Sequence, residues 1–297
     1  MQIPSVHPRI ALIGAGRVGT ALGLALHHAG YPITAVASRT IEHAAELAKL
    51  VSAPQLPLLA AVQHADLVLL VVPDDAIHPL AQVVADAGAW QPRQLVVHAS
   101  GALPAQALAP AAACGALIGS FHPLAAFAQR NTLLPPGLTF GIEAAEPLRG
   151  YLHQIAQELG GYPLDLDAAA KPLYHAAAVL ASNYTVVLAA LAVQLMTTTG
   201  ASEERALAAL LPLLDTTLAN LHDAGLPAAL TGPLVRGDSG TVTRHLAALD
   251  DQYPLIANVY RATGEAALAL LTARHTAPML SELASALASY PVPDEAA

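Results

Sequence analysis

The sequence is poor in charge, and especially in positive charge. Only 12% of its 297 residues are charged, and 13 lysines and arginines stand against 22 aspartates and glutamates, for a formal net charge of −9. A groove for DNA or RNA needs clustered basic side chains that neutralise phosphates, and the sequence contains no such cluster. We therefore expect no nucleic acid among the partners of this protein.

Cysteine is nearly absent as well. Cys114 is the only one, so no disulfide can form within the chain. The first eight residues lack the basic and then apolar layout of a secretory signal, and both facts favour a cytoplasmic protein. Apolar residues are abundant at 55%, and the length is sufficient for two domains with a substantial buried core.

One long segment has no formal charge at all. It lies between Lys171 and Glu203 and is long enough to cross a bilayer. Because it carries His175 and Asn183, and because a helix that is apolar on most sides is also expected inside a protein, we prefer a buried helix and predict no membrane span. Such a helix would be roughly 45 Å long at 1.5 Å per residue, more than one small domain can cover. We therefore predict a homodimer with Pro172–Ser202 at its centre.

The chain changes character near Asp167. Before it, short apolar runs alternate with amphipathic segments, which is typical of a parallel sheet covered on both faces. We predict strands at Arg9–Ile13, Ile33–Ala37, Leu67–Val72, Leu95–His98, Leu117–Phe121, Leu138–Ile142 and Pro163–Leu166, with helices such as Val18–His28 and Ile41–Leu50 between them. After it we predict only helices, at Ala168–Thr199, Glu203–His222, Thr241–Leu249, Pro254–Ala273 and about Pro278–Ser289. The pattern predicts an α/β Rossmann domain over 1–167, followed by an all-α substrate and dimerisation domain over 168–297.

The first strand runs directly into a glycine motif. Gly14 would make the tight turn, Gly16 would let the backbone approach a pyrophosphate, and Gly19 would allow close packing of helix and strand. The N-terminus of the following helix offers unpaired N–H groups to the phosphates. We therefore predict a dinucleotide site formed by Gly14, Ala15, Gly16, Arg17, Val18 and Gly19.

The end of the second strand favours NADP(H) over NAD(H). NAD-binding domains usually carry an acidic residue there for the ribose hydroxyls, but no acid occurs between Ile33 and Ile41. Ser38, Arg39 and Thr40 offer donors instead, and a guanidinium pairs well with a phosphate. The third strand ends in Val72-Pro73, predicted to line the cofactor, and Asp74 and Asp75 are interpreted as caps of a helix beginning at Ala76.

Two later strands end in residues that can take part in chemistry. Ser100 and His122 each follow a strand whose carboxyl end should lie near the nicotinamide. A neutral histidine could exchange the proton that accompanies hydride transfer, and Ser100 could bond substrate or the nicotinamide ribose. For His122 a packed, structural histidine remains an open alternative, and for His98 the structural interpretation is preferred.

The predicted helical domain begins with a further polar group. Lys171 and His175 are one turn apart, Ser182 returns to their face and Asn183 lies beside it. Burying such a group is costly unless it meets a ligand or partner. Arg236 is a candidate for a substrate carboxylate, while Asp238 or Ser239 should cap the next helix.

These motifs resemble a known family along nearly the whole chain. Tyr174-His175, Ser182-Asn183 and Gly232-Pro233-Leu-Val-Arg236-Gly237-Asp238, with the N-terminal motifs above, are similar to Rossmann-like NADP-dependent oxidoreductases whose helical C-terminal domain has no known function (DUF2520 type). The resemblance implies a fold like that of 6-phosphogluconate dehydrogenases and NADP-linked redox chemistry. More distantly, Ser100 and His122-Pro123 resemble prephenate dehydrogenases, and Lys171 resembles the lysine of β-hydroxyacid dehydrogenases and ketopantoate reductase.

The sequence therefore predicts an NADP-dependent dehydrogenase or reductase. Its substrate would be a small, anionic carbonyl, hydroxyl or imine compound, with His122, Ser100, Lys171 and His175 as catalytic candidates and Asn183 and Arg236 as substrate-binding ones. We predict no metal site. The alternative is a non-catalytic NADP(H) sensor that reports the redox state of the cofactor to a partner.

Overall fold

The structure is a computed structural model, and it describes residues 7–130 and 133–288. The chain divides into two compact units, Met1–Tyr184 and Thr185–Ala297. The domain boundary at Asp167 rests on the change from mixed to helical structure and stays a prediction.

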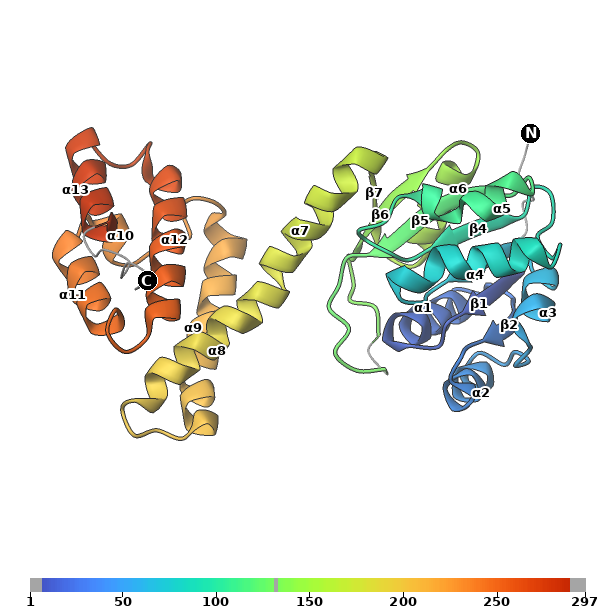
Figure 1. Cartoon of the computed structure of the whole chain (residues 1–297), viewed down its shortest axis with the longest axis horizontal. Coiled ribbons are helices and arrows are strands. Elements are labelled where there is room, and N and C mark those ends of the chain that lie inside the picture. Colours follow the sequence, from blue (N-terminus) through green and yellow to red (C-terminus); the bar gives the residue numbers. More distant parts are fainter. Residues whose placement is uncertain (1–6, 131–132, 289–297) are drawn as a thin grey trace, which may run out of the picture. The chain divides into compact units, whose positions relative to one another are not determined.

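The first unit is built on a seven-stranded sheet with the order β2-β1-β3-β4-β5-β6-β7 (Figure 1). The strands from β1 to β5 are parallel, β6 is antiparallel to β5, and β7 is parallel to β6. The bounds are β1 (Ile10–Ile13), β2 (Ile33–Ala37), β3 (Leu67–Leu70), β4 (Leu95–His98), β5 (Leu117–Pro123), β6 (Thr139–Ala144) and β7 (Tyr162–Asp165).

All the strands predicted from the sequence are present, and their ends differ from the prediction by at most two residues. The direction of β6 is a correction, because a parallel sheet was expected. A parallel neighbour needs a crossover, usually a helix. The described residues between Pro123 and Thr139 contain no helix, so the chain returns antiparallel to β5.

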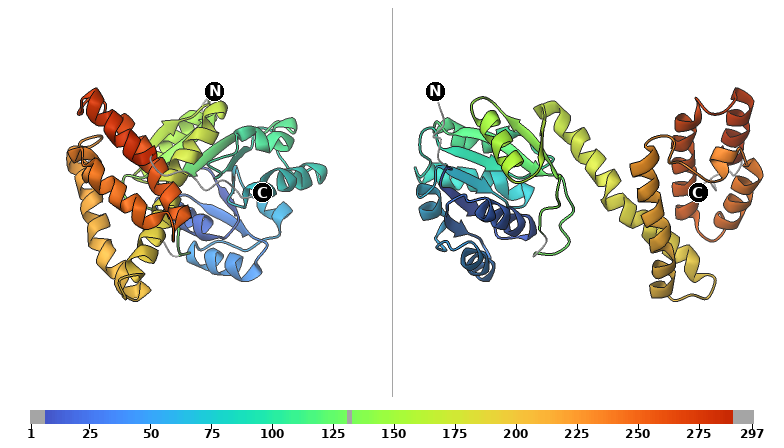
Figure 2. Two further views of the ribbon diagram at one scale, coloured as in Figure 1. Left: turned by 60° about the vertical axis from the view of Figure 1, so that its left-hand side comes forward. Right: turned by 180° about the vertical axis from the view of Figure 1, so that it is seen from behind.

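Helices cover both faces of this sheet (Figures 1 and 2). Alternate residues of a strand point to opposite faces, so Ile10 and Leu12 pack with α1, α2 and α6, while Ala11 and Ile13 pack with α3 and α4. The elements are α1 (Arg17–His28), α2 (Ile41–Leu50), α3 (Leu58–Gln63), α4 (Asp74–Asp86), the 3₁₀ turn η1 (Ala105–Leu108), α5 (Ala109–Ala113), α6 (Leu148–Glu158), the 3₁₀ turn η2 (Ala168–Ala170) and α7 (Lys171–Ala181).

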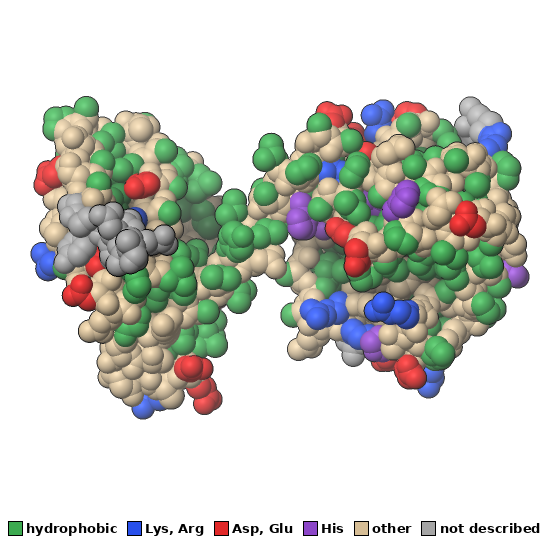
Figure 3. All heavy atoms as spheres, in the orientation of Figure 1, with side chains coloured by type: hydrophobic (Ala, Val, Ile, Leu, Met, Phe, Trp, Pro, Cys, Tyr) green, Lys and Arg blue, Asp and Glu red, His purple; other side chains and the backbone are tan. Residues whose placement is uncertain are grey.

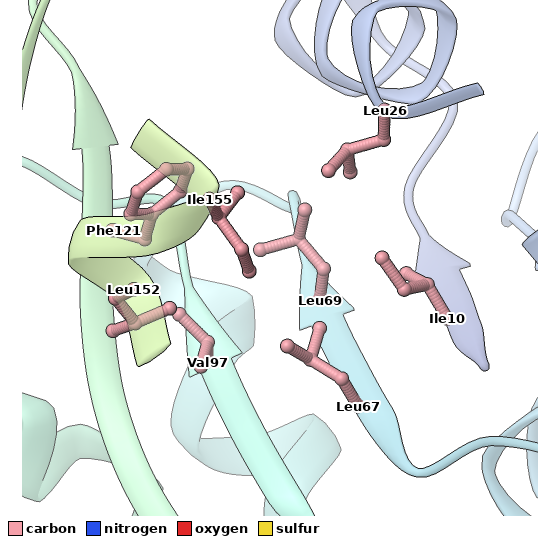
Figure 4. Close-up of a pocket in the computed structure, with 8 residues that line it drawn as sticks. All are labelled: Ile10, Leu26, Leu67, Leu69, Val97, Phe121, Leu152 and Ile155. Carbon is pink, nitrogen blue, oxygen red and sulfur yellow. The ribbon is translucent and has the colours of Figure 1, made fainter. Parts of the chain in front are cut away.

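A small cavity lies in the core between the sheet, α1 and α6 (Figure 4). Its volume is about 10 Å³, roughly the room for one water. The lining is apolar, so a water there would find no hydrogen-bond partner, and the cavity is a packing void rather than a binding site. It is lined by Ile10, Leu26, Leu67, Leu69, Val97, Phe121, Leu152 and Ile155.

The capping role expected of Asp74 and Asp75 is wrong. Helix α4 begins at Asp74 itself, its N-cap is Pro73, and no side chain bonds to the cap. The carboxylate of Asp74 instead accepts a hydrogen bond from the hydroxyl of Ser100 at 2.9 Å. Both aspartates lie in the first turn, where negative charge is favourable toward the helix dipole.

The charge-free segment forms two consecutive helices. The single predicted helix is interrupted at Ser182, between α7 and α8 (Asn183–Thr197). Among the described residues, Ala168–Thr197 is long and apolar enough to cross a membrane. Core helices of soluble proteins can also meet this criterion of length and composition. Its apolar side chains are exposed in the single chain, among them Leu173 at 77% and Val186 at 70%.

The second unit is helical. Val242 and Leu246 of one helix pack against Leu283 and Leu287 of the last one. The carboxylate of Asp238 accepts hydrogen bonds from the backbone N–H and the hydroxyl of Thr241 at 2.9 and 2.7 Å, which confirms it as a helix cap. The helices beyond α8 are α9 (Glu203–Ala224), α10 (Pro233–Arg236), α11 (Ser239–Leu249), α12 (Pro254–Leu271) and α13 (Ala277–Ala288), and the predicted end at Ser289 lies outside the described residues.

Candidate active site

The glycine motif forms a tight loop between β1 and α1. Gly14 has a φ of +114°, and a Cβ on it would lie 2.1 Å from the carbonyl oxygen of Val71. A Cβ on Gly19 would lie 2.1 Å from the oxygen of Gly14, whereas one on Gly16 would meet nothing within 4 Å. Two glycines are thus required by packing, while Gly16 leaves the backbone at the start of α1 open to a ligand.

The other predicted cofactor residues flank this loop. Ser38, Arg39 and Thr40 join β2 to α2, and Val72 and Pro73 join β3 to α4. The neighbouring strands β2, β1 and β3 therefore bring all three segments to one sheet edge. Arg39 is exposed and makes no ion pair with any residue in the described part of the chain.

The loop after β5 lies against the first two helices, which the sequence did not indicate. The Arg17 guanidinium donates to the carbonyl oxygen of Phe127 at 3.3 Å. Arg130 pairs with Glu46 of α2 at 2.9 Å, and its Nε is buried without a hydrogen-bond partner. Several basic side chains gather on this side of the first unit, near α1 (Figure 3).

A row of polar residues crosses β4, β5 and β6 toward the same edge. His98 pairs with Ser120, and Ser120 pairs with Glu143, so the three side chains share one face of the sheet. Helix α7 begins there with Lys171, whose ammonium group donates to the carbonyl oxygen of Ser100 at 3.2 Å and to the hydroxyl of Ser120 at 2.5 Å.

Lys171 is completely buried. Burial lowers the pKa of its ammonium group to about 8, against the opposing attraction of Glu143 and Asp74. The Glu143 carboxylate is 4.0 Å away and accepts a hydrogen bond from the N–H of Ala105. Lys171 therefore ties the first turn of α7 to the turn after β4 and to the middle of β5, and its side chain is not exposed to solvent.

The hydroxyl of Ser100 has a full set of hydrogen bonds within the protein. It donates to Asp74 and accepts from the backbone N–H groups of Ala102 and Leu103 at 3.2 and 3.0 Å. A hydroxyl has one donor and two acceptor positions, so these contacts use all of them. They close the turn after β4.

His122, Tyr174 and His175 form a cluster next to this turn. The Nδ1 of His122 is 2.8 Å from the hydroxyl of Tyr174, and the rings of His122 and His175 are 6.3 Å apart. A Cβ on Gly101 would lie 2.8 Å from Nε2 of His122 and 2.9 Å from Cδ2 of His175. Both imidazoles thus approach the backbone at a position where glycine leaves room.

His122 and Tyr174 are held in their neutral forms. Burial lowers the pKa of His122 to about 4, and the charge of Lys171 acts in the same direction. Burial raises the pKa of the Tyr174 hydroxyl to about 12. The ring of His98 is buried against the carbonyl oxygen of Pro104 and the N–H of Ser100, as expected of a structural histidine.

The structure brings four predicted catalytic candidates together in the first unit: Ser100, His122, Lys171 and His175. Asn183 begins α8, whereas Arg236 ends α10 in the second unit with an exposed side chain. Among the described residues, no group of three or more His, Cys, Asp or Glu is arranged to hold a metal ion. Sequence reasoning missed Tyr174 and Glu143 as site residues, because their partners lie on elements that are distant in the sequence.

Comparisons with known proteins agree with this architecture. A Rossmann-like domain model matches residues 2–123, and a domain of unknown function, DUF2520, matches residues 138–267. Among solved structures, BF3122 of Bacteroides fragilis, provisionally named an NADP oxidoreductase, is 30% identical with a TM-score of 0.70, covering 88% of this chain and 98% of its own.

Two further structures share the fold at lower identity. An imine reductase from Myxococcus stipitatus in complex with NADP⁺ is 21% identical with a TM-score of 0.63, covering 93% of this chain and 99% of its own. A pyrroline-5-carboxylate reductase from Coxiella burnetii is 12% identical with a TM-score of 0.60, covering 96% of this chain and 97% of its own. No curated protein matches the chain.

Proposed function

Because the chain belongs to the family of Rossmann-like proteins with a DUF2520 C-terminal domain, we propose that it is an NADP(H)-dependent oxidoreductase. It transfers a hydride between the cofactor and a small carbonyl, hydroxyl or imine compound. One observation carries the proposal: His122, with His175 beside it, lies at the carboxyl end of β5, in the sheet whose strand β1 leads into the glycine loop. Ligands of open α/β sheets bind outside this edge.

The residues of the first unit fit a dinucleotide. The first turn of α1 has no side-chain cap, and the space around Gly16 is open, so its N–H groups can face phosphates. Arg39 is exposed where a ribose 2′-phosphate would lie. The name of the Bacteroides fragilis relative supports the same cofactor. NADPH, when bound, supplies the hydride.

The contacts favour different roles for the four catalytic candidates. His122 is the group that hydrogen-bonds the reacting oxygen or nitrogen, because its Nε2 has no partner among the residues that the structure describes. His175 lies beside it. Ser100 and Lys171 act as positioning residues, since the hydroxyl of one is fully bonded and the ammonium of the other is buried.

The remaining parts of the proposal concern the substrate and the assembly. The substrate-binding roles of Asn183 and Arg236 stay predictions, and a guanidinium suits a small anionic compound. The exposed apolar side chains of α7 and α8 support a homodimer that covers them. The proposal places the enzyme in the cytoplasm.

The test is NADPH oxidation with a panel of small oxo-acids and imines. We expect turnover by the wild-type protein, and a loss on the order of 10²-fold in His122→Gln with NADPH affinity unchanged. His64→Gln is the matched control, because His64 is an exposed histidine whose ring bonds only to the carbonyl of Ala60. Binding of NADPH without turnover of any compound would contradict the proposal and favour the sensor.

A further inference from the structure

We infer that Tyr174 is a positioning residue that holds His122 in the tautomer with its proton on Nε2, so that the site presents an N–H donor to an uncharged substrate acceptor. The inference rests on the proposed function and deepens it, because it names the group that meets the substrate and the chemical class of the substrate atom. An oxygen of a carbonyl or the lone pair of an unprotonated imine nitrogen can accept this hydrogen bond.

The geometry places the tyrosine hydroxyl on one specific ring nitrogen. Oη of Tyr174 is 2.8 Å from Nδ1 of His122, while Nε2 has no hydrogen-bond partner in the part of the chain described. The sheet makes room for this contact, since Gly141 lies directly opposite His122 in the β5–β6 pair. A Cβ on Gly141 would be 2.7 Å from Oη of Tyr174.

Protonation states decide which partner donates. Tyr174 is protonated at neutral pH because burial raises its pKa to about 12, and His122 is neutral because burial lowers its pKa to about 4. A neutral imidazole has one N–H and one lone pair. Among the described residues Oη of Tyr174 has no other hydrogen-bond partner, so we assign its O–H as the donor to the lone pair on Nδ1, which leaves the single ring proton on Nε2.

The groups around His122 keep it from accepting a second proton. Lys171 and His175 of α7 and His98 of β4 all disfavour a positive charge on the ring. His122 therefore cannot act as an imidazolium acid at neutral pH, and a neutral imidazole can give up its Nε2 proton only if Nδ1 gains one. Tyr174 is placed to supply that proton.

The balanced step in the direction of carbonyl reduction is a relay. Bound NADPH would supply the hydride to the carbonyl carbon, and the Nε2–H bond of His122 breaks as the substrate O–H bond forms. In concert the Oη–H bond of Tyr174 breaks and an Nδ1–H bond forms. The dyad is restored when Nε2 takes a proton from water while the Nδ1–H bond breaks and its proton returns to the tyrosinate oxygen.

A nitrogen-15 NMR measurement tests the tautomer without any substrate. Spectra of the full chain would be recorded at pH 7, with the His122 signals assigned by their disappearance in His122→Gln. We expect a protonated Nε2 and an unprotonated Nδ1 in the wild-type protein. A proton on Nδ1, or on both nitrogens, would overturn the inference.

Two variants remove or displace the Tyr174 hydroxyl and so test its effect on the His122 tautomer. Tyr174→Phe removes it and Gly141→Ala pushes it away, so in both the tautomer preference should be lost. Tyr162→Phe, an exposed tyrosine on β7, is the matched control and should leave it unchanged. Unchanged His122 signals in a folded Tyr174→Phe would also overturn the inference.

Kinetics separates positioning from simple structural support. With a compound that the enzyme turns over, Tyr174→Phe should lower kcat at least tenfold, reduce the solvent isotope effect and leave KM nearly unchanged. A rise in KM alone would count against the relay. If no compound is turned over, the proposed function fails, while the NMR result still decides the tautomer.

Discussion

Replacing Lys171 by methionine should remove a specific pH dependence from the stability of the folded protein. The ammonium group is completely buried, with hydrogen bonds to Ser100 and Ser120 and a carboxylate of Glu143 only at 4.0 Å. Desolvation disfavours the charged form. Its pKa is therefore about 8 in the folded state, against an ordinary 10.5 in the unfolded chain.

The sign follows from proton binding. Between pH 8 and 10.5 the unfolded chain holds the proton of this lysine while the folded protein has released it, so the free energy of unfolding rises with pH. Below pH 8 both states are charged, and folding bears the cost of burying the charge. At 1.36 kcal/mol per pKa unit, the rise over this window amounts to about 3 kcal/mol.

Urea unfolding at pH 7.5, 9 and 10.5 measures this rise. Tyrosines and other groups titrate in the same range, so the quantity to compare is the free energy of unfolding of the wild type minus that of the variant. For Lys171→Met we expect this difference to increase by about 3 kcal/mol with pH. Lys49→Met is the control, because Lys49 is the chain's other lysine and is exposed. Parallel stability curves for wild type and Lys171→Met would refute the reasoning.

Three other outcomes test the cofactor site, the dyad and the assembly. Arg39→Ala should weaken NADPH binding on the order of ten- to a hundredfold and leave NADH binding nearly unchanged in fluorescence titrations; equal effects on both would make Arg39 a mere surface residue. Gly101→Ala should lower kcat by roughly 10²-fold, because the added Cβ displaces His122 and His175, and unchanged kinetics would place those rings away from the reacting atoms. Light scattering at micromolar concentration should give twice the monomer mass of 30.4 kDa, since a second copy would cover Pro172–Ser202; a monomer mass alone rejects the dimer.

Features set by local chemistry were predictable from the sequence. The glycine loop is an example, because the positive φ of Gly14 and the close approach of Gly19 to the carbonyl oxygen of Gly14 both lie within the motif itself. The strands were predictable for a similar reason, since a strand buried on both faces must be apolar throughout.

Features set by contacts between distant segments were not. The local sequence around Asp74 indicates a helix cap. In the structure, however, the sheet brings Ser100 close, and its hydroxyl donates a hydrogen bond to the Asp74 carboxylate. Tyr174 reads as an ordinary aromatic residue, and only the pairing of His122 with Gly141 gives its hydroxyl a partner. The sequence placed Lys171 in the site but could not show that its ammonium is enclosed.

The contact between Gly14 and Val71 has a consequence for how the protein is made. The turn of the glycine loop closes against a carbonyl that is synthesised more than fifty residues later, and the Val71 N–H donates to Ile13 at 2.7 Å. A growing chain that has exposed only β1, α1 and β2 contains the whole glycine motif but lacks the strand against which its turn closes. We therefore expect the loop to hold a dinucleotide only after β3 has emerged from the ribosome and paired with β1, so that the cofactor stabilises a sheet centre that has already assembled.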